Sequence, residues 1–219
     1  MNFARSLTEL AIRAQARSRS EKWVLYERAF PPRVGERVLD VGVSRYDDVP
    51  GENYFLRRYP YPSQLTGVGI EEQSELEKRY PEVTFVHADA RALPFPDRSF
   101  DVVHSNAVIE HVGQATEHAR FVSELVRVGR SGFITTPNRW FPIETHTKLP
   151  FVHWLPLPIF LRIARLVDEA DLRLWLLSEQ GLRRFFSPTT RVELQSTKIL
   201  GWPLTVVALY WVDGGDRNR

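Results

Sequence analysis

The chain has 219 residues, of which 43% are hydrophobic, so it can bury one substantial core and is short for two full domains. Its 29 basic and 27 acidic residues leave a net charge of +2, which does not by itself indicate a nucleic-acid-binding protein. The absence of cysteine excludes a disulfide framework, a thiolate nucleophile and a cysteine-ligated zinc site. We expect a cytoplasmic protein, because the sequence shows neither an apolar run of about 18 residues nor a signal-peptide pattern.

Residues 1–32 are expected to form a helical cap. Apolar residues recur there at helical spacing, and two prolines at 31–32 end the pattern. Four arginines and a single acid within the first 20 residues are also typical of a transit peptide. We favour an amphipathic helical segment.

From residue 33 to residue 138, dense apolar runs alternate with helical patterns. The runs suit strands that are buried on both faces, and they lie at 37–43, 64–70, 83–89, 100–106 and 132–138. Helices are predicted between them, at 52–59, 73–80 and 117–128. This alternation predicts an α/β fold with a doubly wound, mostly parallel sheet and right-handed crossovers.

The character of the chain changes after residue 138. Residues 139–158 are rich in aromatic side chains and prolines, which predicts an ordered loop rather than a regular helix. Helical patterns follow at 159–167, 172–177 and 179–186, with Ser178 as N-cap of the last. Two β-rich runs, 192–200 and 204–212, predict an antiparallel hairpin that completes the sheet.

We therefore expect a single domain with four parts. These are the N-terminal helical cap (1–32), a cofactor-binding core (33–138), a substrate-side loop with helices (139–190) and the C-terminal hairpin (191–219).

The first predicted strand ends in an acid and a glycine. Gly42 would let the backbone approach a ligand closely, and the Asp40 carboxylate can reach a cationic amine directly or through water. A buried strand that simply ends in a turn accounts for these two residues equally well.

Polar side chains also follow the next three strands. Glu71 comes after the second strand, Asp89 ends the third and Asn106 ends the fourth. A carboxylate after the second strand can accept both hydroxyls of a ribose, although acids also favour the first turn of a solvated helix. Ala90 offers a backbone N–H to an adenine edge. Acids at three successive strand ends favour a nucleotide pocket at the carboxyl edge of the sheet.

Four blocks of the sequence carry a family resemblance: RVLDVGVS, LTGVGIEE, FVHADARALPFPDRSFDVVHSNAVIEHV and FVSELVRVGRSGFITTPN. Together they resemble the Rossmann-like S-adenosylmethionine-dependent methyltransferases, in particular the small-molecule branch related to ubiquinone and menaquinone biosynthesis methyltransferases. The resemblance covers roughly residues 33–138 and implies a seven-stranded sheet and S-adenosylmethionine as the cofactor. It also implies a role for each residue at the strand ends: Asp40, Gly42 and Val43 at the methionine moiety, Glu71 at the ribose, Asp89 and Ala90 at the adenine, and Asn106 beneath the sulfonium.

The sequence departs from the family pattern in two places. Ser44 and Tyr46 replace the second and third glycines of the first loop; Ser44 still permits close backbone approach, whereas Tyr46 is expected to re-route the loop. Gly69 stands where the acid that closes the second strand is usual, which leaves Glu71 to substitute for it.

Methyl transfer to a hydroxyl requires alignment of the acceptor and removal of its proton. Our first candidate for the base is His146, oriented by Glu144, in the aromatic loop; His111, after the fourth strand, is the second. The alternative is that these side chains satisfy backbone groups. His87, His104 and His118 are interpreted as incidental. Glu144, His146 and His153 match no metal-ligand spacing, so no metal is expected.

The sequence favours a methyltransferase that acts on a hydroxyl of a small or lipid-linked acceptor. A nicotinamide dehydrogenase would need a glycine fingerprint that VGVSRYDD lacks, and no nucleic-acid partner is expected. A non-catalytic S-adenosylmethionine-binding domain that serves a protein partner is the alternative. The aromatic segment, with Trp140 and Trp154 followed by Arg162 and Arg165, favours an apolar acceptor with an anionic or membrane-bound end and allows peripheral membrane contact. Such a run can also be ordinary core.

Overall fold

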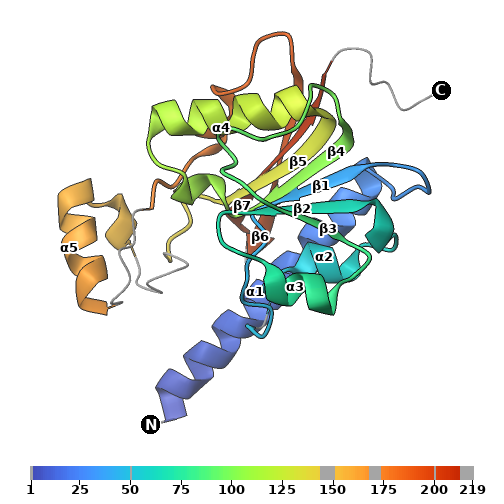
Figure 1. The fold of residues 1–219 in the computed structure, drawn as a ribbon. Coiled ribbons are helices and arrows are strands. Elements are labelled where there is room, and N and C mark those ends of the chain that lie inside the picture. Colours follow the sequence, from blue (N-terminus) through green and yellow to red (C-terminus); the bar gives the residue numbers. More distant parts are fainter. Residues whose placement is uncertain (1, 50, 144–150, 168–173, 200, 213–219) are drawn as a thin grey trace.

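A mixed sheet forms the centre of the computed structural model, which describes residues 2–49, 51–143, 151–167, 174–199 and 201–212 (Figure 1). Within these residues the sheet has seven strands in the order β3-β2-β1-β4-β5-β7-β6. The predicted fold class, a doubly wound and mostly parallel sheet with a C-terminal antiparallel hairpin and an N-terminal helical cap, is confirmed.

The strands match the apolar runs of the sequence. Five are mutually parallel: β1 (Val38–Val41), β2 (Leu65–Gly69), β3 (Thr84–His87), β4 (Phe100–Asn106) and β5 (Gly129–Pro137). The hairpin consists of β6 (Arg191–Ile199) and β7 (Trp202–Trp211), and β7 pairs antiparallel with β5. Because the parallel strands share one direction, their carboxyl ends meet at one edge of the sheet.

The helices between the parallel strands also lie where the patterns predicted them. They are α2 (Tyr54–Arg58), α3 (Ser74–Arg79) and α4 (Ala115–Val128), with short 3-10 helices η1 (Pro62–Gln64) and η2 (Ile109–His111). α4 begins at a capping hydrogen bond from the backbone N of Gln114 to the side-chain Oε2 of Glu117 (3.1 Å), which satisfies a backbone donor at the start of the helix.

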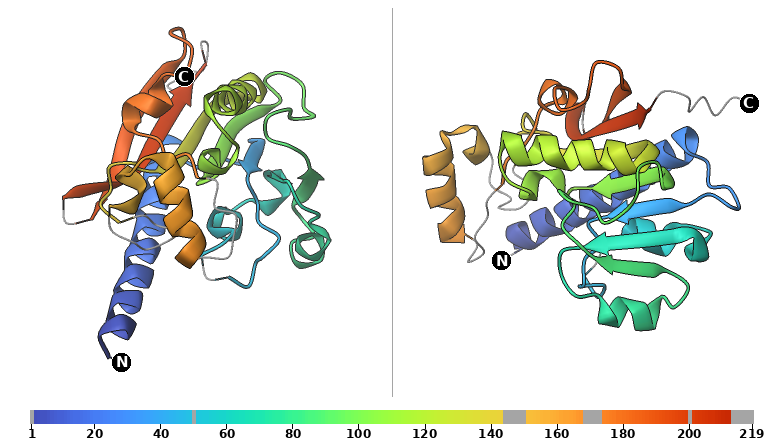
Figure 2. Two further views of the ribbon diagram at one scale, coloured as in Figure 1. Left: turned by 90° about the vertical axis from the view of Figure 1, so that its left-hand side faces the viewer. Right: turned by 45° about the horizontal axis from the view of Figure 1, so that its top comes forward.

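The N-terminal cap is a single helix, α1 (Asn2–Ala29). Its last turns bury Trp23 and Tyr26 against the sheet, and the Tyr26 ring meets Phe133 of β5 edge-on at 5.7 Å. The other end of α1 projects from the body of the molecule (Figures 1 and 2). α1 therefore covers one face of the sheet with its C-terminal part.

The segment between β5 and β6 differs in part from the prediction. It contains η3 (Val152–Trp154), α5 (Leu157–Val167) and α6 (Glu179–Arg183), and Ser178 caps α6 by accepting from Gly181 N at 3.1 Å, as predicted. The predicted helix at 172–177 is wrong for residues 174–177, which are not helical. Their backbone groups bond elsewhere: Trp175 N donates to Glu110 O, and Leu177 O accepts from Arg139 N, both at 3.0 Å.

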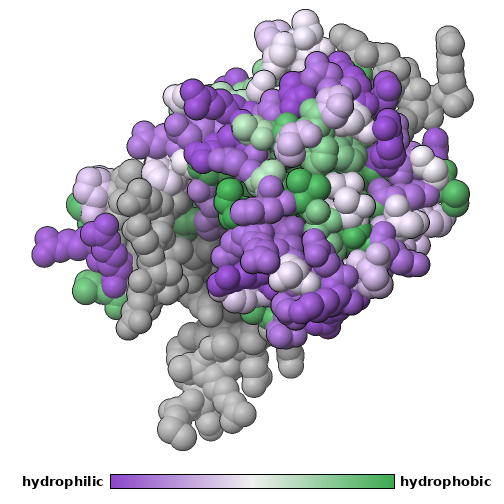
Figure 3. All heavy atoms as spheres, in the orientation of Figure 1, coloured by the Kyte–Doolittle hydropathy of each residue, from purple (hydrophilic) through white to green (hydrophobic). Residues whose placement is uncertain are grey.

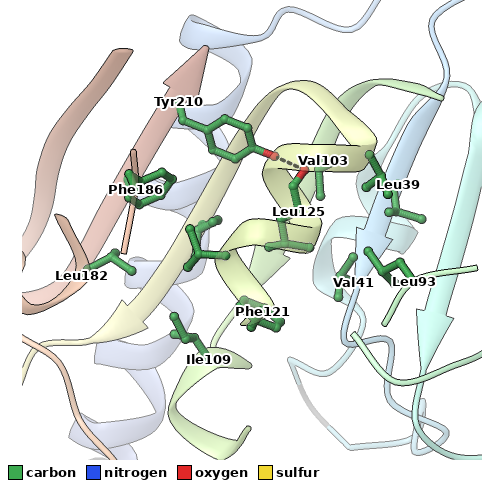
Figure 4. Packing of buried hydrophobic residues seen from close by; sticks show 14 of the residues in the cluster. Leu39, Val41, Leu93, Val103, Ile109, Phe121, Leu125, Leu182, Phe186 and Tyr210 are labelled. Carbon is green, nitrogen blue, oxygen red and sulfur yellow. Dashed lines mark hydrogen bonds between the residues drawn. The ribbon is translucent and has the colours of Figure 1, made fainter. Parts of the chain in front are cut away.

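Apolar side chains pack on both faces of the sheet, as a sheet buried on both sides requires. On one face Phe121 and Leu125 of α4 are fully buried against β1, β4 and β5 (Figure 4). Tyr210 of β7 closes this cluster by donating to Leu125 O at 2.8 Å, and burial raises the pKa of its hydroxyl. On the other face, Tyr26 and its neighbours on α1 pack with α2. The two clusters hold the strand ends in place.

Candidate active site

A cavity of about 170 Å³ opens at the carboxyl edge of the sheet, beside β1 and β4. The strand order reverses between these two strands, because β2 and β3 continue on one side and β5 on the other. Ligands of open α/β sheets bind at such positions. β1, β4, α1 and the residues around the start of α2 line the cavity, among them Asp40, His104, Asn106, Lys22, Tyr26 and Phe55.

Asp40 and His104 form a buried hydrogen-bonded pair in the lining of this cavity. Parallel pairing of β1 with β4 places them side by side, and Asp40 Oδ1 accepts from His104 Nδ1 at 2.7 Å. The His104 ring stacks on Phe55 at 3.8 Å and on Phe133 at 5.6 Å. The interpretation of His104 as incidental is therefore wrong: it occupies one oxygen of Asp40 and fixes the orientation of the carboxylate.

Gly42 is required by the backbone of the loop after β1. Its φ is +97°, a conformation that favours glycine, and a Cβ at this position would overlap Val108. The space beside the Gly42 Cα, where a ligand was expected to approach, is thus filled by the Val108 side chain. Gly42 does line the cavity through its backbone.

Asn53 organises the rest of this loop, which contains Val43, Ser44 and Tyr46. Ser44 N donates to Asn53 Oδ1 at 2.9 Å, and Asn53 Nδ2 donates to Ser44 O at 2.8 Å. Val43 is buried, whereas Tyr46 is 53% exposed. The two hydrogen bonds of the Asn53 side chain therefore hold this glycine-poor loop in place. Sequence reasoning missed Asn53, although an asparagine at positive φ (49°) is a familiar turn residue.

Asn106 accepts two hydrogen bonds at the end of β4. Thr135 Oγ1 donates to Asn106 Oδ1 at 2.8 Å, and Lys22 Nζ donates to the same oxygen at 2.5 Å. Burial lowers the pKa of Lys22 to about 8, although the nearby Glu110 carboxylate acts in the opposite direction. The cavity thus contains a cation that loses its charge just above neutral pH. The sequence offered no signal for Lys22, because the rotation of α1 decides which of its cations faces the sheet.

Three of the predicted cofactor residues do not belong to the described lining of the cavity. Glu71 follows β2, and Asp89 and Ala90 follow β3. Glu71 lies near the surface, with Oε1 3.4 Å from Arg45 Nε. Asp89 accepts from Arg91 Nη2 at 2.6 Å and from Arg91 N at 2.8 Å, and these hydrogen bonds lower the pKa of Asp89. Glu71 is therefore paired with an arginine of the loop after β1, and Asp89 with an arginine two residues further along its own segment.

A buried glutamine covers the end of β2. A Cβ at Gly69 would overlap Gln73 Nε2, so the glutamine amide occupies the space that a side chain at position 69 would enter. Gln73 is 4% exposed, and neither its amide nitrogen nor its amide oxygen has a hydrogen-bond partner among the described residues. The sequence analysis did not consider Gln73.

The candidate bases are only partly visible. Glu144 and His146 lie outside the described residues. His111 lies in η2, is exposed and does not belong to the described lining of the cavity. His153 is buried, with Nε2 3.0 Å from Arg139 O, and so fastens its loop. No group of three His, Cys, Asp or Glu side chains among the described residues could hold a metal ion.

The aromatic segment after β5 lies largely at the surface. Trp140 is 56% exposed and Trp154 39% exposed, and their ring centroids lie 6.3 Å apart. α5, which follows them, stands away from the sheet, and Figure 3 shows both hydrophilic and hydrophobic residues on it (Figures 2 and 3). Phe160 of α5, by contrast, is buried. The core interpretation is thus wrong for both tryptophans.

Known proteins resemble this chain in sequence and in fold. The family model described as "Methyltransferase domain" matches residues 50–134. A probable S-adenosylmethionine-dependent methyltransferase of Mycolicibacterium smegmatis is 34% identical over 122 residues, which make up 53% of this chain and 44% of that protein. A 2-methyl-6-phytyl-1,4-hydroquinone methyltransferase of Synechocystis is 37% identical over 116 residues, 51% of this chain and 33% of that protein. Residues 50–134 therefore match a methyltransferase domain, in a chain that is similar to S-adenosylmethionine-dependent methyltransferases.

Structural similarity extends beyond the matched part of the methyltransferase domain. A crystal structure of a Pyrococcus horikoshii protein covers 90% of this chain and 91% of its own, with a TM-score of 0.60 and 18% identity, which shows a shared fold. The chain spans less than half the length of the two curated relatives. The ubiquinone and menaquinone branch stays a prediction.

The residues of the methyltransferase domain fit S-adenosylmethionine. Asp40 presents a buried carboxylate at the strand-order reversal, and the unsatisfied Gln73 amide lies at the end of the neighbouring strand β2. A cationic amine and a sugar hydroxyl are the groups that such side chains bind.

Among the described residues, no helix has the length and apolar character needed to cross a bilayer.

Proposed function

We propose that this protein transfers a methyl group from S-adenosylmethionine to a hydroxyl of a small or lipid-linked acceptor. The observation that carries the proposal is the cavity beside β1 and β4, where Asp40 and Asn106 meet aromatic side chains of α1 and α2. Polar groups for the cofactor and apolar walls for an acceptor then lie in one enclosure.

The cofactor supplies an activated methyl group, so the protein has to align the acceptor and manage its proton. In this proposal Asp40 binds the ammonium of the methionine moiety, and Asn106 lies beneath the sulfonium. Gly42, Val43 and Ser44 border the methionine moiety, and Asp89 with Ala90 borders the adenine.

Three groups are candidates for handling the acceptor proton. His146, oriented by Glu144, remains our first proposal, and His111 the second, because an imidazole titrates near neutral pH. Lys22 joins them on the structural evidence, since it lies in the cavity and its pKa is about 8. Its hydrogen bond to Asn106 places it next to the sulfonium position of this proposal.

The acceptor is proposed to carry an apolar or ring portion. Trp23, Tyr26 and Phe55 supply aromatic walls to the cavity, while Trp140 and Trp154 expose further aromatic surface after β5. A relative named for a phytyl hydroquinone agrees with such an acceptor. The alternative function, a non-catalytic S-adenosylmethionine-binding domain that serves a protein partner, differs in that it would bind the cofactor and transfer no methyl group.

The test is ligand binding followed by turnover. S-adenosylhomocysteine at a hundredfold excess over its dissociation constant is expected to stabilise the native state by about 2.7 kcal/mol, measured as a shift of the melting temperature. Asp89→Ala is expected to weaken this binding while the ligand-free protein stays folded, because Asp89 is only partly buried. A folded protein that does not respond to millimolar S-adenosylhomocysteine or S-adenosylmethionine would contradict the proposal. Binding without methyl transfer to prenylated hydroquinones or phenols would favour the non-catalytic alternative.

A further inference from the structure

Gln73 is a buried polar side chain that the proposed contacts do not use. It is the N-cap residue of α3, yet its side chain makes no capping hydrogen bond. Both polar atoms of the amide lack a partner among the described residues, and the residue is 4% exposed. An amide buried in this way costs about 1–3 kcal/mol. A ligand that bonds to both atoms would recover this cost.

The surroundings of Gln73 show where such a ligand would lie. A Cβ at Gly69 would overlap Gln73 Nε2 and would come within 2.6 Å of Val43 O, so the amide lies between the last residue of β2 and the loop after β1. Glycine at position 69 is therefore what makes room for the amide. Nucleotide sites of open α/β sheets hold the ribose at the end of the second strand, usually by an acid.

Glu71, the predicted ribose ligand after β2, is paired with an arginine at the surface. Glu71 lies 3.4 Å from Arg45 Nε, and its side chain is 42% exposed. An exposed carboxylate is already hydrated, so exchanging water for a sugar hydroxyl gains little for it. The buried Gln73 amide, by contrast, has no hydrogen-bond partner among the described residues of the ligand-free protein, so a hydrogen bond to a sugar hydroxyl stabilises the complex.

We infer that Gln73, rather than Glu71, holds the ribose of the cofactor. The amide oxygen accepts from one ribose hydroxyl, and the amide NH₂ donates to the oxygen of the other. Gly69 and Gln73 together replace the acid that usually ends the second strand. The inference rests on the proposed function, since it assigns a residue to the same cofactor.

The experiment measures dissociation constants by calorimetry for S-adenosylhomocysteine and its 2′,3′-dideoxy analogue. Gln73→Met removes both polar atoms at nearly constant shape, and Glu71→Gln is the matched control. For the unaltered protein we expect the dideoxy analogue to bind about tenfold more weakly than S-adenosylhomocysteine, as for two lost hydrogen bonds. For Gln73→Met the two ligands are expected to bind alike, and for Glu71→Gln the tenfold difference is expected to persist.

A second readout does not need the ligand. Removing a buried amide that lacks partners is expected to raise the melting temperature of Gln73→Met by about 2–4 °C. If Gln73→Met does not fold, that result overturns the claim that the amide is unsatisfied, and Gln73→Ala then tests the ligand discrimination. The assignment is overturned if the Gln73 variant still binds S-adenosylhomocysteine more tightly than the dideoxy analogue. It is also overturned if Glu71→Gln loses this difference. If the unaltered protein binds neither ligand, the proposed function fails as well, whereas binding without ribose discrimination overturns only this inference.

Discussion

At the scale of single residues, the site depends on side chains that neighbouring strands and helices present to the strand ends. Asp40 and Asn106 were predicted, and each is bonded to a residue that was not: His104 and Lys22 respectively. His104 comes from the strand adjacent to Asp40, while Lys22 reaches Asn106 from α1 and shares its oxygen with Thr135 of β5. The chemistry at these two strand ends is therefore set together with residues of neighbouring elements.

Lys22→Met should change how cofactor binding depends on pH. Burial lowers the pKa of Lys22 to about 8, so below pH 8 the folded protein carries a positive charge in the cavity, and above it the amine is neutral. A protonated Lys22 repels the sulfonium cation of S-adenosylmethionine but not the uncharged thioether of S-adenosylhomocysteine. The ratio of their affinities should therefore rise in favour of S-adenosylmethionine as the pH increases through 8, by about fivefold for about 1 kcal/mol of repulsion.

Calorimetric titrations of both ligands at several pH values between 7 and 9 measure this ratio. The ratio in Lys22→Met is the baseline, because it retains any difference between the titrations of the two ligands' own amino groups. The rise of the ratio with pH is expected to be about fivefold smaller in Lys22→Met than in the unaltered protein. An equal rise in both proteins would show that another group causes the dependence.

At the scale of elements, two segments outside the parallel core decide the character of the site. α1 lies against the sheet through Trp23 and Tyr26 and forms one wall of the cavity. The aromatic segment and α5 leave the end of β5 and expose Trp140 and Trp154. α1 therefore helps to enclose the proposed reaction centre, whereas the aromatic segment presents apolar surface outside the cavity.

Truncation of the exposed tryptophans tests whether the aromatic segment binds the acceptor. Trp140→Ala and Trp154→Ala are expected to raise the half-saturating concentration of a prenylated hydroquinone acceptor about tenfold, as for the loss of 1.5 kcal/mol or more of apolar contact. The dissociation constant of S-adenosylmethionine should stay unchanged. Trp202→Ala is the matched control, because Trp202 is 52% exposed on the hairpin.

Initial-rate kinetics and saturable quenching of tryptophan fluorescence report the two affinities. If both variants behave like Trp202→Ala, the acceptor is bound by the cavity walls alone. An acceptor that proves small and fully polar would contradict the proposed role of the segment.

At the scale of the whole molecule, the site depends on two apolar clusters on opposite faces of one sheet. Phe121 of α4 is fully buried in the first cluster, and Tyr26 of α1 is 1% exposed in the second. Since β1 and β4 lie between these clusters, loosening either would displace the strand ends that carry Asp40 and Asn106. Stability and cofactor binding are therefore coupled through the sheet.

Phe121→Ala is expected to lower the free energy of unfolding by about 3–5 kcal/mol, because it removes buried ring contacts and leaves a cavity. Ile159→Ala, at a position 49% exposed on α5, should change it by no more than about 0.5 kcal/mol. Chemical denaturation with two spectroscopic probes measures both values. A small effect of Phe121→Ala would show that α4 packs loosely on the sheet.

The sequence by itself determined the order of the strands and helices from 33 to 138, the C-terminal hairpin and the polar residues at the strand ends. These features are local: a dense apolar run forms a buried strand wherever it lies, and the residue that ends it follows in the chain. The helix predicted at 172–177 failed for 174–177 because partners distant in sequence, Glu110 and Arg139, bond to its backbone.

Only the tertiary structure decided which residues meet across elements. His104 reaches Asp40 through strand pairing, Lys22 reaches Asn106 through the packing of α1, and Gln73 fills the space above Gly69. Strand register, helix rotation and the space that a glycine leaves are set by packing over the whole chain. For this reason the sequence could name the edge of the sheet where a cofactor would bind, while the full set of side chains that surround it came from the fold.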